Sequence, residues 1–125
     1  MRILLIEDDN LVRAVLVDCL LDACFDVIDF SDPHVALGAF DRSEPPDVVI
    51  TDVDLGSKLD GFAVATAIHH SSPTVPVILI SGRPTGQREQ NLDPHDRFLQ
   101  KPFSNDHLLR TIEQLTERGY SPRPE

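Results

Sequence analysis

Short apolar runs that alternate with helical stretches constrain the fold of this 125-residue chain more than any other feature. Five such runs are typical of strands, over residues 2–6, 27–30, 48–51, 75–81 and 98–100. Apolar residues at helical spacing predict helices over about 11–24, 33–41, 61–70 and 105–119. Parallel strands need crossover helices and are buried on both faces. The sequence therefore predicts an α/β fold with one doubly wound parallel sheet.

The stretch over residues 82–97 departs from this pattern. Leu92 is its only aliphatic residue, so any helix here has no apolar face to bury. We expect such a helix to be short, and the backbone of residues 86–96 to open easily. We expect one domain over residues 1–119 and a flexible tail over residues 120–125.

Charge and hydropathy exclude several classes of function. The net charge of −10 repels a phosphate backbone, which argues against nucleic-acid binding by this chain. No apolar run approaches the ~20 residues of a membrane span, and we expect a cytoplasmic protein. Cys19 and Cys24 lie five apart in a predicted helix and point to different faces, so we expect two small buried or half-buried thiols rather than a disulfide.

Ionisable and hydroxyl side chains stand where four predicted strands end. Glu7 and Asp8 follow the first strand, Asp52 ends the third, Ser81 ends the fourth and Lys101 follows the fifth. One such residue is often a helix cap or a solvated side chain. Four strand ends together are hard to explain as caps, because parallel strands end at one edge, where ligands bind.

Carboxylates gathered at one edge repel each other. Two unit charges ~4 Å apart cost about 4 kcal/mol at an effective dielectric constant of ~20. Either one acid is protonated or a cation binds, and a site with few protein oxygen ligands suits Mg²⁺. An aspartate beside Mg²⁺, an amine and a hydroxyl is equipped to accept a phosphoryl group.

The chain resembles the receiver domains of two-component response regulators. The resemblance rests on "ILLIEDD", "VVITDVDLGSKLDG", "VILISG" and "LQKPF", in this order. It implies a (βα)5 flavodoxin-like fold with strand order 2-1-3-4-5. By the family pattern, Asp52 matches the phosphoacceptor, and the Mg²⁺ ligands would be Glu7, Asp8, Asp52 and the backbone carbonyl of Asp54. Ser81 and Lys101 match the residues that contact the phosphoryl group, and Ser81 and Phe98 match the switch residues. The Lys101-Pro102 bond matches one that is usually cis in the family.

The resemblance also implies partners. The phosphoryl donor would be a sensor histidine kinase or a histidine phosphotransfer protein, and a downstream protein would read the switched surface. The domain would catalyse only its own phosphotransfer and dephosphorylation, and a homodimer is compatible with it. Asp54 and Arg83, each two residues past a site residue, could pair beside the path of attacking water, or Arg83 could be a solvated loop residue.

Alternatives to this assignment remain open. "DVD" also resembles the motif of haloacid-dehalogenase-type Mg²⁺-dependent phosphatases, but that motif usually ends the first strand, and only about seventy residues follow it here. A pseudo-receiver that binds without phosphorylation would usually lack part of the acid, lysine and hydroxyl set.

The chain also departs from the family pattern. The loop over residues 55–58 lacks a proline that is common in the family. No DNA-binding or enzymatic segment follows the last predicted helix, so we expect a stand-alone receiver or a piece of a longer regulator.

Overall fold

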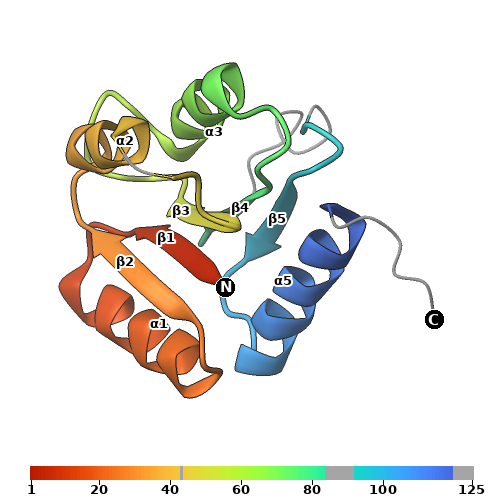
Figure 1. The fold of residues 1–125 in the computed structure, drawn as a ribbon. Coiled ribbons are helices and arrows are strands. Elements are labelled where there is room, and N and C mark those ends of the chain that lie inside the picture. Colours follow the sequence, from red (N-terminus) through yellow and green to blue (C-terminus); the bar gives the residue numbers. More distant parts are fainter. Residues whose placement is uncertain (43, 84–91, 120–125) are drawn as a thin grey trace.

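The computed structural model describes residues 1–42, 44–83 and 92–119. Its strands are β1 (Arg2–Ile6), β2 (Asp26–Phe30), β3 (Val48–Asp52), β4 (Val77–Ser81) and β5 (Arg97–Gln100). Its helices are α1 (Asn10–Asp22), α2 (Pro33–Asp41), α3 (Gly61–Ser71) and α5 (Asn105–Gly119). The strands form one parallel sheet in the order β2-β1-β3-β4-β5, with helices on both faces (Figure 1). The predicted α/β fold and strand order are confirmed.

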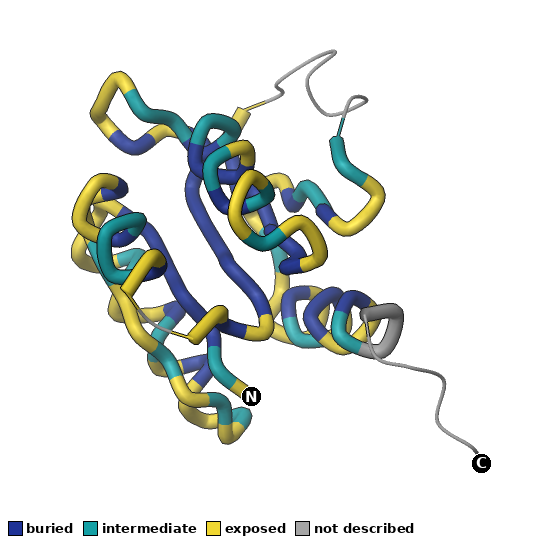
Figure 2. Tube along the Cα trace, turned by 45° about the horizontal axis from the view of Figure 1, so that its top comes forward, coloured by how far each residue is buried: buried dark blue, intermediate teal, exposed yellow. Residues whose placement is uncertain are grey.

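Successive side chains of each strand point to opposite faces of the sheet, and so build two cores. The core under α2 and α3 includes Leu4, Ile6, Ala36, Phe40, Val49, Val64, Ile68 and Leu79. The core under α1 and α5 includes Ile3, Leu5, Leu16, Leu20, Ile50, Ile78, Leu108 and Ile112. Figure 2 shows the central strands buried along their length, as β3 and β4 are. Burial of each leucine or isoleucine side chain contributes roughly 1.5–3 kcal/mol to the stability of the fold. The two cores thereby fix the sheet and the positions of its strand ends.

The ends of several elements differ from the prediction for local reasons. β4 begins two residues later than expected, because the main-chain N–H of Val75 turns back to the carbonyl of Ser72 at 3.2 Å. α1 ends at Asp22, and Cys24 then takes a positive φ of 69°. Cys19 is buried as expected, but Cys24 is exposed, and both thiols are free.

Two residues just before β5, Leu92 and Asp96, are better anchored than the polar composition around them indicates. Residues 84–91 lie outside the described residues, as does the predicted tail over 120–125. Leu92 packs against the core under α2 and α3, and Asp96 is buried. Asp96 is thus an anchored residue within the stretch 86–96, since it accepts a main-chain hydrogen bond from Val77 at 2.9 Å, and easy opening of that backbone stays a prediction.

Within the described ranges, the search for a helix long and apolar enough to span a membrane finds none.

Candidate functional site

Asp52 is the last residue of β3, and its main chain is held from both sides. The main-chain N–H of the next residue, Val53, donates to the carbonyl of Ile80 on β4 at 2.8 Å. Gly61 opens α3 directly against this turn, so close that a Cβ there would stand 2.5 Å from the carbonyl oxygen of Asp52. The missing side chain at position 61 lets α3 pack onto the turn that presents Asp52.

A turn of three acids follows β1, and we call residues 7–9 the acidic turn. Asp9 caps α1 by accepting the main-chain N–H groups of Leu11 and Val12 at 2.9 and 3.1 Å. Its own N–H donates to Oε2 of Glu7 at 3.2 Å. The carboxylate of Asp9 is therefore engaged as the helix cap, and those of Glu7 and Asp8 can belong to the site.

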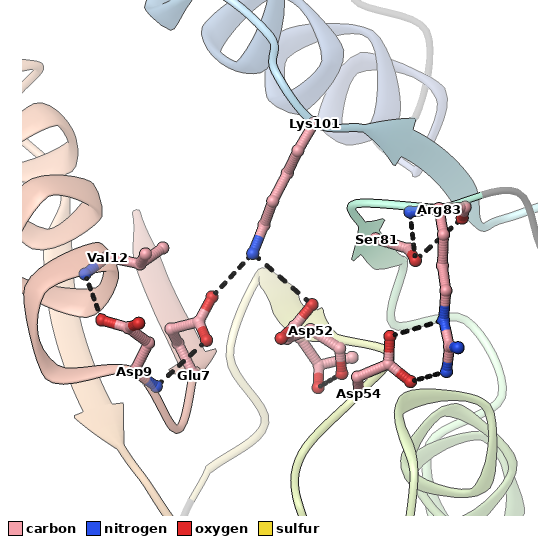
Figure 3. Close-up of polar contacts among 9 residues, drawn as sticks. Glu7, Asp9, Val12, Asp52, Asp54, Ser81, Arg83 and Lys101 are labelled. Atoms are coloured by element: carbon pink, nitrogen blue, oxygen red, sulfur yellow. Dashed lines mark hydrogen bonds and ion pairs between the residues drawn. The ribbon is translucent and has the colours of Figure 1, made fainter.

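The fold brings Glu7, Asp8 and Asp52 together. One carboxylate oxygen from each residue lies within 4.8 Å of the others. The ammonium group of Lys101 lies 3.4 Å from Oε1 of Glu7 and 3.7 Å from Oδ1 of Asp52 (Figure 3). Lys101 reaches this position from the end of β5, where its main-chain N–H donates to the carbonyl of Ser81 at 2.8 Å. The Lys101-Pro102 peptide bond is cis.

Burial dominates the electrostatics of this cluster. The pKa of Glu7 is raised from 4.5 to about 7: burial is the main cause and the charge of Asp52 adds to it, while the N–H of Asp9 and the charge of Lys101 oppose it. Burial also raises the pKa of the Asp52 carboxyl above its ordinary value of 3.8, against the opposing effect of Lys101. One lysine therefore does not compensate three converging acids, and the cluster favours either a proton on one acid or an additional cation.

The Ser81 hydroxyl is engaged away from these acids. It donates to the main-chain carbonyl of Arg83 at 2.9 Å and accepts the N–H of the same residue at 3.2 Å. The Arg83 guanidinium binds both carboxylate oxygens of Asp54, with Nη2 2.7 Å from Oδ1 and Nε 3.2 Å from Oδ2. These two side chains are 73% and 50% exposed, so the pair stands at the rim of the site.

Phe98 lies outside the charged cluster. It sits on β5 opposite Leu79 of β4 and packs, half-buried, against the core under α2 and α3. A switch at this position therefore involves a core contact and not a direct contact with the acids.

Sequence reasoning missed two arrangements. Arg13 of α1 contacts the main chain of the acidic turn, with Nη1 2.9 Å from the carbonyl oxygen of Glu7. At the opposite edge of the sheet, Nε2 of His69 lies 3.1 Å from Oδ1 of the buried Asp96. An arginine one turn into a helix after an acidic strand end is a usable signal for the first. The second joins α3 to the start of β5, and no local pattern reveals it.

Comparisons with known proteins agree on one family. The family model for the response regulator receiver domain matches residues 3–113. The transcriptional regulatory protein TcrA of Mycobacterium tuberculosis is 33% identical over 125 residues, which cover 98% of this chain and 49% of that protein. The transcriptional regulatory protein QseB of Haemophilus influenzae is 36% identical over 122 residues, covering 96% of this chain and 54% of that protein. The chain thus spans about half the length of these relatives.

Solved structures agree with the fold. A response regulator receiver protein from Sinorhizobium medicae superposes with a TM-score of 0.89 at 28% identity, over 96% of this chain and 97% of that one. The receiver domain of a sensor histidine kinase from Pseudomonas aeruginosa, which has a magnesium ion in its active-site cleft, gives a TM-score of 0.80 at 26% identity, over 92% of this chain and 96% of that one.

Proposed function

Because this chain belongs to the response regulator receiver domains of two-component systems, we propose that Asp52 accepts a phosphoryl group from the phosphohistidine of a sensor kinase or a phosphotransfer protein. The observation that carries the proposal is the convergence of Glu7, Asp8 and Asp52 beside the single ammonium group of Lys101. The domain we propose as the working unit is residues 1–119.

The donor set fits Mg²⁺. Three carboxylates converge, and two of them are buried enough to raise their pKa values. Hard oxygen ligands in this number leave room for the waters that Mg²⁺ retains. Glu7, Asp8 and Asp52 would hold the ion, together with the backbone carbonyl of Asp54. When bound, the ion would neutralise negative charge on the acids and on the incoming phosphoryl oxygens.

The remaining chemistry falls to side chains of this chain. A carboxylate oxygen of Asp52 attacks phosphorus, so that a P–O bond forms as the P–N bond to the donor histidine breaks, and the imidazole nitrogen keeps the bonding electron pair. Lys101 stands beside the attacking carboxylate and supplies a positive charge for the transferred oxygens.

Ser81 connects this chemistry to a change of shape. A hydrogen bond to a charged group contributes roughly 1.5–3 kcal/mol, compared with about 1 kcal/mol for a neutral one. The phosphoryl group therefore competes for the Ser81 hydroxyl, which now binds the main chain of Arg83. Movement of this hydroxyl would open space for Phe98 and alter the surface around β5, which a downstream protein would read.

An exposed apolar strip beside the site supports docking of a protein donor. Leu11 and Val15 lie one turn apart on α1, directly after the acidic turn, and are 80% and 63% exposed. Exposed apolar side chains next to a reactive group favour a protein surface as the partner. The net charge of −10 continues to argue against nucleic acid as the partner.

The two rival functions receive less support. Asp52 ends β3 and not the first strand, which disfavours a haloacid-dehalogenase-type phosphatase. A pseudo-receiver would not need Lys101 within 4 Å of both Glu7 and Asp52, at 3.4 and 3.7 Å. We propose that the domain signals and does not turn over a phosphomonoester.

The test is phosphorylation of the Asp52→Asn variant by acetyl phosphate with Mg²⁺. We expect a hydroxylamine-sensitive phosphoryl label on the wild-type protein and none on the variant. Asp18→Asn, which changes an exposed acid of α1, is the matched control and should label like the wild type. A label retained by Asp52→Asn would contradict the assignment, and steady phosphomonoester hydrolysis would favour the phosphatase.

A further inference from the structure

Arg13 of α1 uses three nitrogen atoms on three neighbours. Its Nη1 donates to the main-chain carbonyl of Glu7 at 2.9 Å. Its Nη2 donates to Oδ1 of Asn10 at 2.8 Å, and its Nε to Oδ2 of Asp29 on β2 at 3.1 Å. The Arg13 side chain is only 20% exposed, so these bonds are partly shielded from water. A rigid, planar fork of donors can make such a set, which a lysine cannot.

These contacts fix the point where the chain leaves the sheet and enters the acidic turn. The N–H of Glu7 donates to the carbonyl of Phe30 on β2 at 3.0 Å. Its carbonyl is held by Arg13, which is itself tied to β2 through Asp29. Both main-chain groups of Glu7 are thus bound, one directly by the edge strand and one through the guanidinium.

We infer that Arg13 is a positioning residue for the cation site of the acidic turn. It acts through the carbonyl of Glu7, which sets where the carboxylates of Glu7 and Asp8 stand before a cation arrives. A turn that is ordered in advance loses less conformational entropy when its ligands gather around an ion. The inference rests on the proposed function, because it takes Glu7 and Asp8 as Mg²⁺ ligands.

The first measurement is the dissociation constant of Mg²⁺ by titration calorimetry on the full chain. Arg13→Met keeps the apolar stem and removes every donor, and we expect binding roughly 10-fold weaker, the lower range for residues that orient metal ligands. Arg13→Lys restores one donor and should recover part of the loss. Asp29→Asn leaves the Arg13–Glu7 bond in place and should change the constant by less than about 2-fold.

Two further readouts separate positioning from general destabilisation. With acetyl phosphate, Arg13→Met should need about 10-fold more Mg²⁺ for half-maximal phosphorylation, yet reach nearly the wild-type rate at saturation. Without Mg²⁺, amide exchange at Asp8 and Asp9 should accelerate in this variant while the amides of β4 keep their protection.

The possible failures are distinguishable. A wild-type protein that does not bind Mg²⁺, or an Asp8→Ala variant with an unchanged constant, would refute the cation site and the inference with it. A wild-type protein that binds Mg²⁺, with the same constant and the same exchange in Arg13→Met, would refute only the role of Arg13. If Arg13→Met does not fold, Arg13→Lys decides: a lysine cannot reproduce the planar fork that holds the Glu7 carbonyl, so a wild-type constant with wild-type exchange would refute the role of Arg13.

Discussion

Arg83 joins two parts of the site at the scale of single residues. Its main chain holds the Ser81 hydroxyl, and its guanidinium holds Asp54 across the mouth of the site. The pair is exposed, so it contributes little to stability. Under the proposed function its place would matter more than its strength, because the family resemblance puts this pair beside the path of the water that attacks in line.

We expect Arg83→Ala to speed loss of phosphate from Asp52 several-fold, with little change in phosphotransfer from the kinase. The measurement is decay of the phosphorylated protein in excess Mg²⁺ after removal of the donor. If the ion pair is the barrier, Asp54→Ala should speed decay as well, and the double variant should add nothing further. Arg42→Ala, a charge change at the C-terminal end of α2, serves as the control. Equal half-lives for Arg83→Ala and wild type would show that this pair does not guard the phosphoryl group.

Gly61 permits a second prediction at this scale. Its ideal Cβ would meet main-chain atoms of Asp52 and Val53 at 2.5 and 2.8 Å, so Gly61→Ala must push α3 away from the site. We expect a loss of roughly 1–3 kcal/mol in the free energy of unfolding, measured by urea denaturation. Gly82→Ala is the matched control, since nothing lies within 4 Å of its Cβ. A larger loss for Gly82→Ala than for Gly61→Ala would contradict this account.

The sequence predicted which acids and which lysine form the candidate site, but not the residues that hold these side chains in position. Asp52 and Lys101 could be found because charged side chains at the ends of apolar strands are conspicuous. Arg13 binds a main-chain carbonyl, and Gly61 acts through a missing side chain. Neither effect leaves a pattern of hydrophobic periodicity, and only Arg13, one turn into a helix after an acidic strand end, offers a signal in the sequence.

At the scale of elements, a histidine ties α3 to the start of β5. Nε2 of His69 lies 3.1 Å from Oδ1 of Asp96 and 3.1 Å from the carbonyl of Val75. Asp96 also accepts the N–H of Val77, the first residue of β4. One buried carboxyl thereby links a helix end with the beginnings of two strands. The sequence underestimated this segment because its anchor is a polar network with a distant helix.

This network predicts a pH-dependent stability. Burial raises the pKa of Asp96 from 3.8 to about 6, so the folded state holds this proton more tightly than the unfolded state does. The contribution of Asp96 to stability is therefore fully present below pH 3.8 and is lost as pH rises towards about 6. We expect the wild type to lose roughly 1–3 kcal/mol relative to Asp96→Asn across this window, by urea denaturation at each pH. A constant difference between the two proteins from pH 3.5 to about 7 would contradict the assignment.

In the molecule as a whole, the sheet topology gathers the charged site residues at one edge. The parallel sheet brings the carboxyl ends of β1, β3, β4 and β5 together in a chain with a net charge of −10. The alternation of strands and helices predicted the layered fold. The strand order could not be obtained from periodicity, since any doubly wound sheet gives the same pattern, and it came from resemblance to a family.

We expect Mg²⁺ to raise the melting temperature of the wild type. Binding relieves repulsion among three acids and occurs only in the folded site, which contributes about 2.7 kcal/mol at 100 times the dissociation constant. Asp8→Ala should lose most of this gain, while Asp18→Ala should keep it. NaCl at equal ionic strength separates specific binding from screening of the net charge. An Asp8→Ala variant with the full Mg²⁺ response would argue that the ion binds elsewhere.

The hydrogen bonds of the Ser81 hydroxyl would also set the level of output from the unphosphorylated protein. Two neutral bonds of about 1 kcal/mol each would leave roughly one unphosphorylated molecule in thirty with this hydroxyl free at any instant. Under the proposed function, a downstream protein would meet a background of a few per cent from molecules that were never stimulated. Both bonds go to the main chain of Arg83, so substitution of the Arg83 side chain would leave this background unchanged. The ratio of signal to background would thus depend on the main chain at residue 83 and not on the side chain there.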